Sequence, residues 1–385
     1  MSRLNDLIKE LCPNGVEYKK LEDCCNILDN KRKPVSKGVR ENGEYPYYGA
    51  NGIQDYINDY IFDGKYVLVG EDGSVQTANG TPVVNWAVGK IWVNNHAHII
   101  EEIDGVSLRY LYHYFQIVDV KDLIHGNIPK LNQGDFRNIK IAIPPLEVQE
   151  EIVRILDKFG ELEAELEAEL EARKSQYEFW HGKVFDNIDA KFVKLSDLCK
   201  IGDGLHGTPR YLDDGDYYFI NGNNLMNGKI IFDEKTKKVS KTEFENQNIK
   251  LDKNTLLMSI NGTIGKVSYY DDEKIMLGKS VAYFSILDEK VLSKKYLFYL
   301  LQAPRSVRYY NDSLTGSTIL NLGLKALREF EIPLPPIEEQ NKISNILEHF
   351  DKLINDITVG IPAEIELRRK QYEYYRNKLL TFEEI

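Results

Sequence analysis

The sequence predicts an α+β fold in which one α/β domain occurs twice and each copy is followed by a long helix. The first observation is a repeated motif: residues 144–149 read Pro-Pro-Leu-Glu-Val-Gln, and residues 335–340 read Pro-Pro-Ile-Glu-Glu-Gln. The second is the apolar pattern that follows each motif. A repeat of this kind indicates two similar structural units. The matching apolar pairs are Ile152 and Ile343, Ile155 and Ile346, Leu156 and Leu347, Phe159 and Phe350, and Leu162 and Leu353.

The segments before the two helices share a composition typical of strands and loops. Both are rich in Gly, Tyr, Asn and β-branched residues, with strand-like runs at 66–69 and 91–93 in the first and at 255–258 and 281–284 in the second. A chain of 385 residues is long enough for two domains with separate cores. The predicted boundaries are 1–143 for the first domain, 144–186 for the first helix, 187–334 for the second domain and 335–385 for the second helix.

The repeat also extends, more faintly, into the globular segments. Residues 67–74 align with residues 256–263, and each stretch contains a turn after an apolar strand. Cys25 aligns with Cys199 at the start of a strand pattern. The scaffold therefore repeats while the intervening loops differ, which is the pattern expected of recognition loops on a common scaffold.

The helices carry the clearest periodicity. Apolar residues between 149 and 185 recur at steps of three, four or seven, which marks one face of a helix. About 37 residues span roughly 55 Å, more than the surface of one domain requires. Two helices with matching stripes are expected to pair as an antiparallel coiled coil. Gly360 and Pro362 are expected to break the second helix about midway.

The net charge of −11 is concentrated on the helices. Residues 146–185 carry eleven acidic against five basic side chains, and residues 337–385 carry ten against seven, which leaves −2 for the rest. A duplicated chain suits a ligand with two equivalent halves, and DNA read as two half-sites is the leading candidate. Because phosphate neutralisation supplies much of the affinity for DNA, we expect weak binding by the chain alone and a basic partner that adds the rest.

The apolar segments and the cysteines of the sequence indicate the compartment in which the protein acts. It has no run of eighteen apolar residues, and its first residues lack the apolar core of a signal peptide. The four cysteines, which lack CxxC spacing, are expected to be reduced and mostly buried: Cys12, Cys24, Cys25 and Cys199. A cytoplasmic protein is the resulting expectation.

These motifs resemble the specificity subunits of type I restriction-modification systems, over essentially the whole chain. The resemblance rests on the repeated Pro-Pro motif, on Ile-Leu-Asp-Lys-Phe at 155–159 and on Arg-Arg-Lys-Gln-Tyr-Glu-Tyr-Tyr at 368–375. The Leu-Glu-Ala-Glu tetrapeptides within 162–173 resemble the short repeats that one group of this family carries in its spacer.

The resemblance implies a noncatalytic subunit with two target recognition domains separated by a coiled coil. Each domain would read one half of a bipartite, asymmetric site in double-stranded DNA, and the helices would set the unread gap. The implied partners are two methyltransferase subunits that use S-adenosylmethionine to methylate adenine, and restriction subunits that use ATP to translocate and cut DNA. No cofactor is expected on this chain itself.

In the first domain, a basic cluster follows the first predicted strand and precedes an aromatic and amide cluster. Arg and Lys suit phosphates and guanine edges, and Asn suits adenine. A solvated loop is the plain alternative for such a cluster. The candidate DNA-binding residues here are Lys31, Arg32, Lys33, Lys37, Arg40, Tyr47, Tyr48 and Asn51.

The second domain offers polar residues at the equivalent loop, and a further candidate segment precedes each helix, at 126–133 and 316–321. Structural turns are the alternative for the Asn and Gly residues of these segments. The candidates are His206, Thr208, Arg210, Asn221, Asn223 and Asn224 in the loop region, Lys130 and Asn132 in the first further segment, and Ser317, Thr318 and Asn321 in the second.

Four aromatic residues near the helix ends are candidates for docking a partner subunit. They are Tyr177, Trp180, Tyr372 and Tyr375. Packing within the coiled coil is the alternative for these side chains.

Motifs for catalysis or metal binding are not evident in the sequence. Lys279 lies in a Gly-Lys-Ser triplet that resembles the end of a P-loop, but Glu273 stands where a P-loop requires glycine. His96 and His98 would share one face of a strand, and no third ligand is evident near them. The alternative functions are a self-contained DNA methyltransferase or nuclease with unrecognised motifs, and a scaffold that does not read DNA.

Deleting one tetrapeptide, residues 166–169, tests whether this helix acts as a ruler. The deletion shortens the helix by about 6 Å and rotates its remaining turns by roughly 40°. Base pairs rise by about 3.4 Å each, so we expect the two half-site sequences to persist while the gap between them shortens by about one or two base pairs. Methylation mapping of a strain that carries the deletion measures this. An unchanged gap in an active variant would exclude the ruler.

Overall fold

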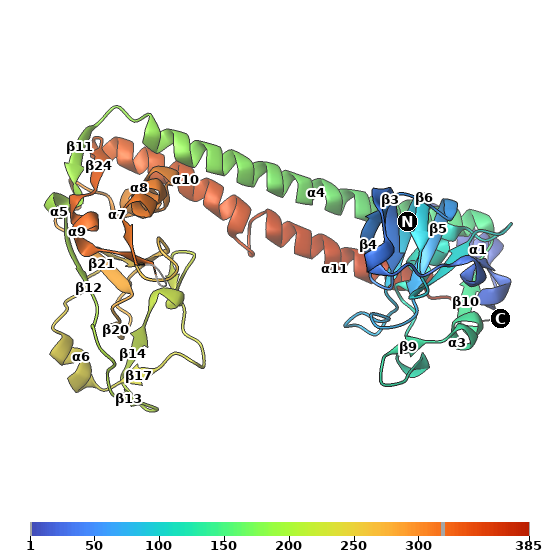
Figure 1. The fold of residues 1–385 in the computed structure, drawn as a ribbon. Helices are drawn as coiled ribbons and strands as arrows, with labels where there is room; N and C mark the ends of the chain where they lie inside the picture. Colours follow the sequence, from blue (N-terminus) through green and yellow to red (C-terminus); the bar gives the residue numbers. More distant parts are fainter. Residues whose placement is uncertain (1, 317–319, 385) are drawn as a thin grey trace. The chain divides into compact units, whose positions relative to one another are not determined.

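The computed structural model describes residues 2–316 and 320–384 and divides into two compact units (Figure 1). Unit 1 comprises Met1–Glu167 and Glu364–Ile385, and unit 2 comprises Ala168–Ala363. Each unit combines strands and short helices around its own hydrophobic core. The predicted class, two α/β copies with long helices, is confirmed. Within the described residues, no helix combines the length and hydropathy needed to cross a bilayer.

Unit 1 is built on a six-stranded sheet in the order β2-β7-β5-β6-β3-β4. Successive side chains of its central strand point to opposite faces: Val67 and Val69 lie in the core with helix α2 (Leu108–Phe115), and Leu68 lies in a separate cluster. Both faces are therefore covered, which explains the continuous apolar run in the sequence. The strands are β2 (Asn26–Ile27), β3 (Asn42–Gly49), β4 (Gly52–Ile57), β5 (Phe62–Gly70), β6 (Val84–Val93) and β7 (Ala97–Glu101).

Unit 2 contains two four-stranded sheets, in the orders β12-β21-β18-β19 and β13-β17-β14-β20. The first repeats part of unit 1, because β12-β21-β18 pair in the same antiparallel order as β2-β7-β5. The strands are β12 (Cys199–Asp203), β13 (Tyr211–Leu212), β14 (Tyr217–Ile220), β17 (Lys238–Val239), β18 (Thr255–Ser259), β19 (Val267–Tyr269), β20 (Ile275–Leu277) and β21 (Val281–Ile286).

Small two-stranded ladders complete both units. Two kinds of ladder have one copy in each unit. The ladder β1 (Glu17–Lys20) with β10 (Lys140–Ile143) corresponds to β11 (Lys191–Lys194) with β24 (Glu331–Leu334). The ladder β8 (Ile124–His125) with β9 (Lys130–Leu131) corresponds to β22 (Leu314–Thr315) with β23 (Asn321–Leu322). Unit 2 adds β15 (Leu225–Met226) with β16 (Lys229–Ile230).

The helices fall into short ones within the units and long ones that follow the Pro-Pro motifs. The long helices are α4 (Leu146–Asp186), α10 (Ile337–Asn355) and α11 (Ile361–Leu380). The other helices are α1 (Ser2–Leu11), α3 (Gln133–Asn138), α5 (Leu195–Leu198), α6 (Lys241–Gln247), α7 (Lys294–Gln302), α8 (Pro304–Asp312) and α9 (Leu324–Glu329).

The long helices pair within each unit. In unit 1, Phe159 of α4 stacks on Tyr375 of α11 at 5.4 Å between ring centroids, and Glu163 accepts a hydrogen bond from Arg369 at 2.6 Å. Later residues of α4 thus meet earlier residues of α11, so the pair is antiparallel, as predicted. In unit 2, Tyr177 of α4 packs against the core that contains residues of α10.

The predicted break in the second long helix is confirmed, because α10 ends at Asn355 and α11 begins at Ile361. Gly360 lies at the break. A Cβ atom there would lie 2.6 Å from the carbonyl oxygens of Asp356 and Lys352, so a side chain at this position would clash with the backbone of the break.

The four cysteines are free and buried, as the sequence predicted. Burial raises the pKa of the Cys24 thiol to about 11. Thiolates are the reactive form of cysteine, so a thiol of this kind serves packing.

Both ends of the described chain contribute to unit 1. The backbone N–H of Val16 donates to the carbonyl of Glu383 at 2.9 Å, and the Tyr18 hydroxyl donates to the carbonyl of Phe382 at 2.9 Å. Leu4 of α1 packs in the same core as Leu380.

A buried glutamine fixes the start of each long helix in the same way. Gln149 and Gln340 have no exposed surface, and each makes three hydrogen bonds to the backbone. The bonds of Gln149 are from Ser107 N (2.9 Å) and to the carbonyls of Gly105 (3.1 Å) and Pro144 (2.8 Å); those of Gln340 are from Ser293 N (2.9 Å) and to the carbonyls of Val291 (2.8 Å) and Pro335 (2.8 Å). The last residue of the repeated motif therefore clamps the helix to its own domain.

Replacing Gln149 or Gln340 with alanine should destabilise the corresponding unit. Each substitution leaves one buried N–H and two buried carbonyls with fewer partners, at about 1–3 kcal/mol for each unsatisfied group. We expect a loss of about 2–4 kcal/mol in the free energy of unfolding, measured by urea denaturation of the full chain. Gln176→Ala, on the exposed surface of α4, is the matched control. Equal stability of Q149A and Q176A would refute the clamp.

Candidate nucleic-acid interface

In both units the segment before the long helix is joined to the turn that follows a central strand. Segment 129–131 meets the turn after β5 in unit 1, and segment 320–322 meets the turn after β18 in unit 2. The hydrogen bonds are Gly73 N to Pro129 O (3.0 Å), Leu131 N to Glu71 O (2.8 Å), Gly262 N to Leu320 O (3.1 Å) and Leu322 N to Ile260 O (2.9 Å). We call this arrangement the strand–turn joint.

In unit 2, the strand–turn joint borders an open hollow of about 710 Å³. The hollow brings together three predicted residues, His206, Asn221 and Asn321, from segments distant in the sequence. It also contains Asn261 and Lys279, which were not predicted from the sequence. The remaining lining residues are Asp203, Ile260, Gly262, Ser280, Leu322, Gly323 and Leu324.

The two missed residues had signals that were interpreted differently. Asn261 lies in the stretch aligned with residues 67–74, whose sequence predicts a plain turn. Lys279 lies in a triplet that does not complete a P-loop, but its side chain is exposed at the hollow.

The first candidate loop of unit 2 is exposed. His206, Thr208 and Arg210 lie on this loop, and all three are open to solvent. The Nε2 atom of His206 lies 2.7 Å from a carboxylate oxygen of Asp203, so this carboxylate holds the ring at the rim of the hollow. The loop is therefore accessible to a ligand.

The asparagine cluster of unit 2 divides into structural and accessible side chains. Asn224 accepts from the backbone N–H of Asn221 at 2.9 Å and donates to the carbonyl of Ile231 at 3.0 Å. It stabilises the turn η5 (Gly222–Asn224), so its predicted role in DNA contact is replaced by a structural one. Asn221 accepts from the Ser280 hydroxyl at 3.0 Å, and Asn223 is exposed.

The basic cluster of unit 1 divides in the same way. Lys31, Lys33 and Lys37 are all exposed. Arg32 is turned inward: its side chain is 10% exposed, and its Nη1 atom lies 2.5 Å from a carboxylate oxygen of Glu71. The prediction that Arg32 contacts DNA is therefore corrected, because its guanidinium group is already engaged inside the domain.

Arg40, Tyr47 and Tyr48 also serve the scaffold rather than an open surface. The Arg40 guanidinium donates to the carbonyl of Val35 at 2.9 Å and lies 4.1 Å from the centre of the Tyr47 ring. Tyr47 and Tyr48 are 1% and 8% exposed, so the prediction that they contact DNA is corrected. Asn51 is exposed between β3 and β4 and remains accessible.

The segment before the long helix of unit 1 carries one accessible cation. Lys130 is about half exposed, with its Nζ atom 3.2 Å from Glu71. Asn132 accepts from the backbone N–H of Asp135 at 2.9 Å, so it caps α3 and its predicted DNA contact is replaced by that role. In unit 2, Ser317 and Thr318 lie outside the described residues.

A buried charged cluster lies beneath the strand–turn joint of unit 1. His98 is fully buried; its Nδ1 atom lies 2.7 Å from Asp29 and its Nε2 atom 2.9 Å from the carbonyl of Leu131. Burial by itself raises the pKa of Asp29, but the hydrogen bond from His98 and the charges of His98 and Arg32 bring it below its ordinary value. His96, which was expected on the same strand face, precedes β7 and pairs with Asp72 at the surface.

This cluster has the donor atoms of a metal site but not its charge. Side-chain atoms of Asp29, Glu71 and His98 lie within 4.8 Å of one another. However, Arg32 and Lys130 already pair with Glu71. The carboxylates are thus neutralised by protein cations, and the arrangement fits an internal ion network better than a metal ion.

The comparison with known families concerns the same two segments of the chain. The family described as type I restriction modification DNA specificity domain matches twice, at residues 13–172 and 187–367. The chain belongs to this family. Its members are DNA-recognition components that do not act catalytically, which excludes the alternative of a self-contained methyltransferase or nuclease.

Individual relatives cover nearly the whole specificity subunit. A putative type I restriction enzyme specificity subunit of Haemophilus influenzae is 36% identical over 392 residues, 98% of both chains. The EcoR124I/EcoR124II specificity subunit of Escherichia coli is 30% identical over 86% of this chain and 89% of that protein. The type I S subunit from M. genitalium has a TM-score of 0.55 at 14% identity, over 96% of this chain and 97% of that one, and shows the same fold.

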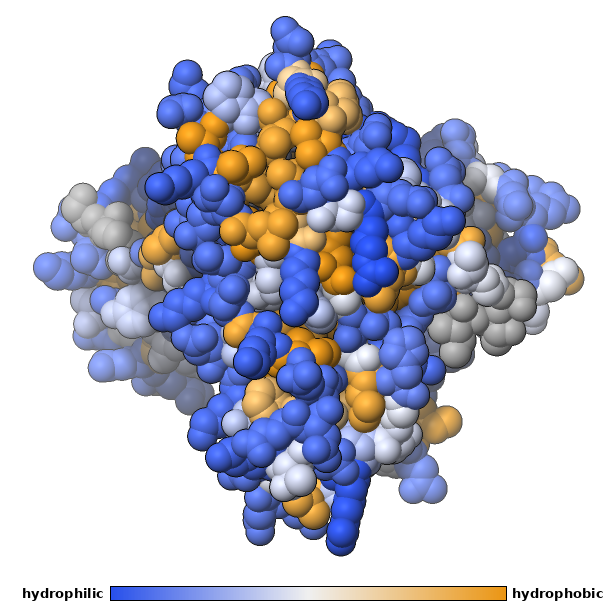
Figure 2. Space-filling model, turned by 90° about the vertical axis from the view of Figure 1, so that its left-hand side faces the viewer, coloured by the Kyte–Doolittle hydropathy of each residue, from blue (hydrophilic) through white to orange (hydrophobic). Residues whose placement is uncertain are grey.

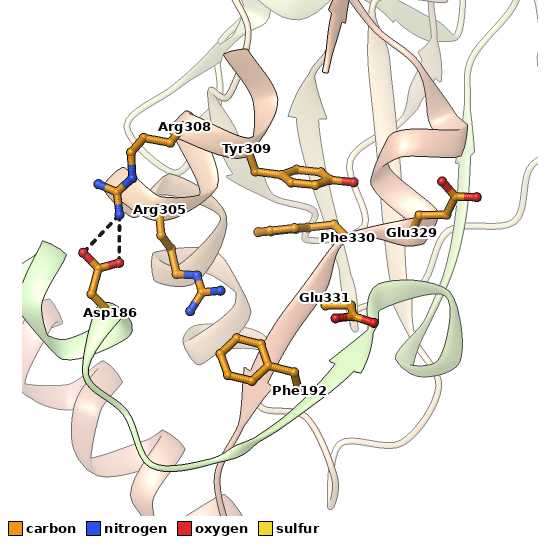
Figure 3. A pocket seen from close by; sticks show the side chains of 8 residues that line it. All are labelled: Asp186, Phe192, Arg305, Arg308, Tyr309, Glu329, Phe330 and Glu331. Atoms are coloured by element: carbon orange, nitrogen blue, oxygen red, sulfur yellow. Dashed lines mark hydrogen bonds and ion pairs between the residues drawn. The ribbon is translucent and has the colours of Figure 1, made fainter. Parts of the chain in front are cut away.

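The first hollow lies at the start of α9, where Leu324 lines it. A second hollow of the specificity subunit, of about 660 Å³, lies at the end of α9, where Glu329 lines it (Figure 3). Arg308 pairs with Asp186 at 2.9 Å, and the Arg305 guanidinium lies 4.9 Å from the centre of the Phe192 ring. Three carboxylates line the hollow with these two arginines, so it offers no excess of positive charge for a phosphate. No predicted site residue lies here. The other lining residues are Tyr309, Glu329, Phe330 and Glu331.

The surface around this end of unit 2, where β11 and β24 lie in Figure 1, is mainly hydrophilic, with hydrophobic side chains gathered in places (Figure 2). Phe192 is one of the large hydrophobic side chains of unit 2 that remain exposed.

The aromatic residues of the long helices are divided between core and surface. Tyr177 and Tyr372 pack against the hydrophobic cores, and Tyr375 stacks on Phe159, so their predicted role in partner docking is replaced by core packing. Trp180 is 48% exposed and remains a candidate for docking a partner subunit.

Two exposed aromatic clusters, one in each unit, occupy equivalent positions of the repeat. In unit 2, Phe179 is 54% exposed, and the Nζ atom of Lys183 lies 5.0 Å from its ring centre. In unit 1, Tyr374 is 60% exposed, and the Nζ atom of Lys378 lies 5.8 Å from its ring centre. We call them the helix aromatic clusters, with Trp180 beside Phe179 in the first.

Proposed function

We propose that this specificity subunit reads a bipartite, asymmetric site in double-stranded DNA, with one half read by each unit. The observation that carries the proposal is the strand–turn joint. The same backbone hydrogen bonds occur in both units, while the side chains around them differ: Glu71 and Lys130 in unit 1 correspond in position to Ile260 and Asn321 in unit 2. One scaffold with two different polar surfaces suits two different half-sites.

The proposed domain limits follow the sequence prediction. Residues 1–143 and 187–334 are the recognition domains, and residues 144–186 and 335–385 are the spacer helices. The positions at which α4 and α10 begin, Leu146 and Ile337, support these limits.

The accessible residues are the proposed DNA contacts. In unit 1, Lys31, Lys33, Lys37 and Lys130 suit phosphates, because surface lysines bind as point charges. Asn51 suits a base edge, since an amide pairs well with adenine. In unit 2, the candidates are His206, Thr208, Arg210, Asn223 and Lys279, with Asn221, Asn261 and Asn321 in the hollow.

The proposed methylation and restriction require partner subunits. We propose that two methyltransferase subunits methylate adenine in the site that this subunit reads, and that restriction subunits join the same complex. The near-neutral recognition domains beside acidic helices support a need for these partners in tight DNA binding. The buried, free cysteines support the cytoplasm as the place of action.

Exchanging residues 187–334 for the same segment of a relative with a different specificity tests the two-reader proposal. We expect one half of the methylated sequence to change and the other half to persist, because each unit has its own core and its own strand–turn joint. Methylome sequencing of a host with the exchanged gene measures the outcome. Loss or change of both halves in a folded, active complex would contradict the proposal.

Mutation of the helix aromatic clusters tests where the methyltransferase subunits dock. Buried aromatic anchors commonly contribute about 2 kcal/mol or more at an interface, roughly 30-fold in affinity. We expect F179A/W180A to weaken binding of one methyltransferase copy and Tyr374→Ala to weaken the other. Native mass spectrometry of the assembled complex counts the bound copies.

Leu287→Ala provides the control, because this side chain is 65% exposed but lies outside the helices. Two methyltransferase copies bound with unchanged affinity in the F179A/W180A/Y374A variant would place the docking surface elsewhere.

A further inference from the structure

We propose that His98 is a positioning residue for the first half-site: a buried, doubly protonated imidazolium that ties the loop of Lys31 and Lys33 to the segment of Lys130. The inference rests on the proposed function, in which unit 1 reads one half of the site. His98 has no exposed surface, so it acts through the two segments that it joins and does not touch DNA.

The hydrogen-bond partners determine the protonation state of the ring. The Nδ1 atom faces a carboxylate oxygen of Asp29 at 2.7 Å, and the Nε2 atom faces the carbonyl oxygen of Leu131 at 2.9 Å. A backbone carbonyl only accepts, and an ionised carboxylate only accepts. Asp29 is held in its ionised form by further donors, the backbone N–H of Ile99 at 3.0 Å and the Gln133 amide at 3.2 Å. Both ring nitrogens must therefore donate, which only the imidazolium form does.

The elements packed around the ring supply one aromatic contact and a network of charged groups. Phe136 of α3 stacks on the imidazole at 4.1 Å with nearly parallel planes. The facing charged groups are Asp29 and Arg32 beside η2 (Asp29–Lys31), Glu71 after β5, and Lys130 on β9. Because Asp29, Glu71 and His98 are buried, loss of one of them leaves others unsatisfied, so the network holds its segments in one arrangement.

Unit 2 shows that the scaffold does not require this network. In unit 1, His98 of β7 pairs with Val69 of β5, and at the corresponding place in unit 2, Ala282 of β21 pairs with Met258 of β18. Glu71 of the strand–turn joint corresponds to Ile260. The same pairing of strands is thus stable with two apolar residues, where unit 1 buries charges.

Replacing buried charges with apolar residues is often neutral or stabilising. The fold does not need this network, and the network joins two candidate DNA-contacting segments. Positioning these two segments is therefore the best explanation for it. Lys31 and Lys33 lie close behind Asp29 in the chain, and Lys130 precedes Leu131 directly. The two ends of the imidazolium therefore set the spacing between the exposed cations that meet one half-site.

The test uses the full chain in complex with its methyltransferase subunits. The methylated motif is first determined with the wild-type complex. Methylation rates are then measured on DNA duplexes with the intact site, with one substituted base pair in the first half, and with one in the second half. Discrimination is the ratio of the rate on the intact site to the rate on a substituted one.

Three variants separate positioning from folding. The E71I/H98A variant copies the apolar solution of unit 2. His98→Asn retains a donor toward Asp29, and His98→Gln retains a donor toward Leu131. We expect discrimination at the first half to fall by about tenfold or more in each variant. Each variant loses at least one hydrogen bond in which the donor or the acceptor is charged. Discrimination at the second half should not change.

His181→Asn is the control, because His181 is a buried histidine of unit 2 that donates to the carbonyl of Tyr299 at 2.8 Å. Discrimination at the first half should be unchanged in this variant. Folded variants of His98 that keep first-half discrimination, or that lose both halves equally, would overturn the positioning role. A wild-type complex without a bipartite motif would instead refute the proposed function, and the inference with it.

Discussion

The structure depends on one buried side chain at the start of each long helix. Gln149 and Gln340 each make three hydrogen bonds with the backbone of their own domain. A buried amide has a high cost if unpaired, so it allows only a narrow range of geometries. The direction in which the helix leaves its domain is thereby set by the same chemistry in both units. In the proposed function the long helices set the gap between the two half-sites, and this role requires stiff junctions.

The two units show how one scaffold supports two surfaces. The pairing of the shared strands, the ladders beside the long helices and the strand–turn joint are common to both. The side chains at the joint are not: unit 1 buries an ion network around His98, and unit 2 has Ile260 and Ala282 in the corresponding places with an open hollow beside them. Backbone hydrogen bonds carry the repeat, and the side chains above them are free to differ. In the proposed function, this one scaffold serves two unlike half-sites.

The long helices illustrate how far periodicity reaches. The apolar stripe, the antiparallel pairing and the break at Gly360 follow from residue spacing alone, because helical geometry determines which positions share a face. The stripe did not reveal which aromatics near its end are covered. Tyr177 packs in the core of unit 2, while Phe179 and Trp180 remain exposed. Coverage depends on which domain packs beside that turn of the helix, and that information lies far away in the chain.

The sequence by itself determined the duplicated α+β plan, the family and the segments that carry the candidate site. Repeats and periodic patterns are local properties, and the same backbone requirements recur wherever they occur. The tertiary structure decided which side chains in those segments are accessible. Arg32, Tyr47 and Asn224 look like ligand-binding residues in the sequence but are held by Glu71, Val35 and Ile231 inside the domains. Charge and hydrogen-bonding capacity are written in the residue type, but the partner that satisfies them is chosen by the fold, because that partner comes from another part of the chain.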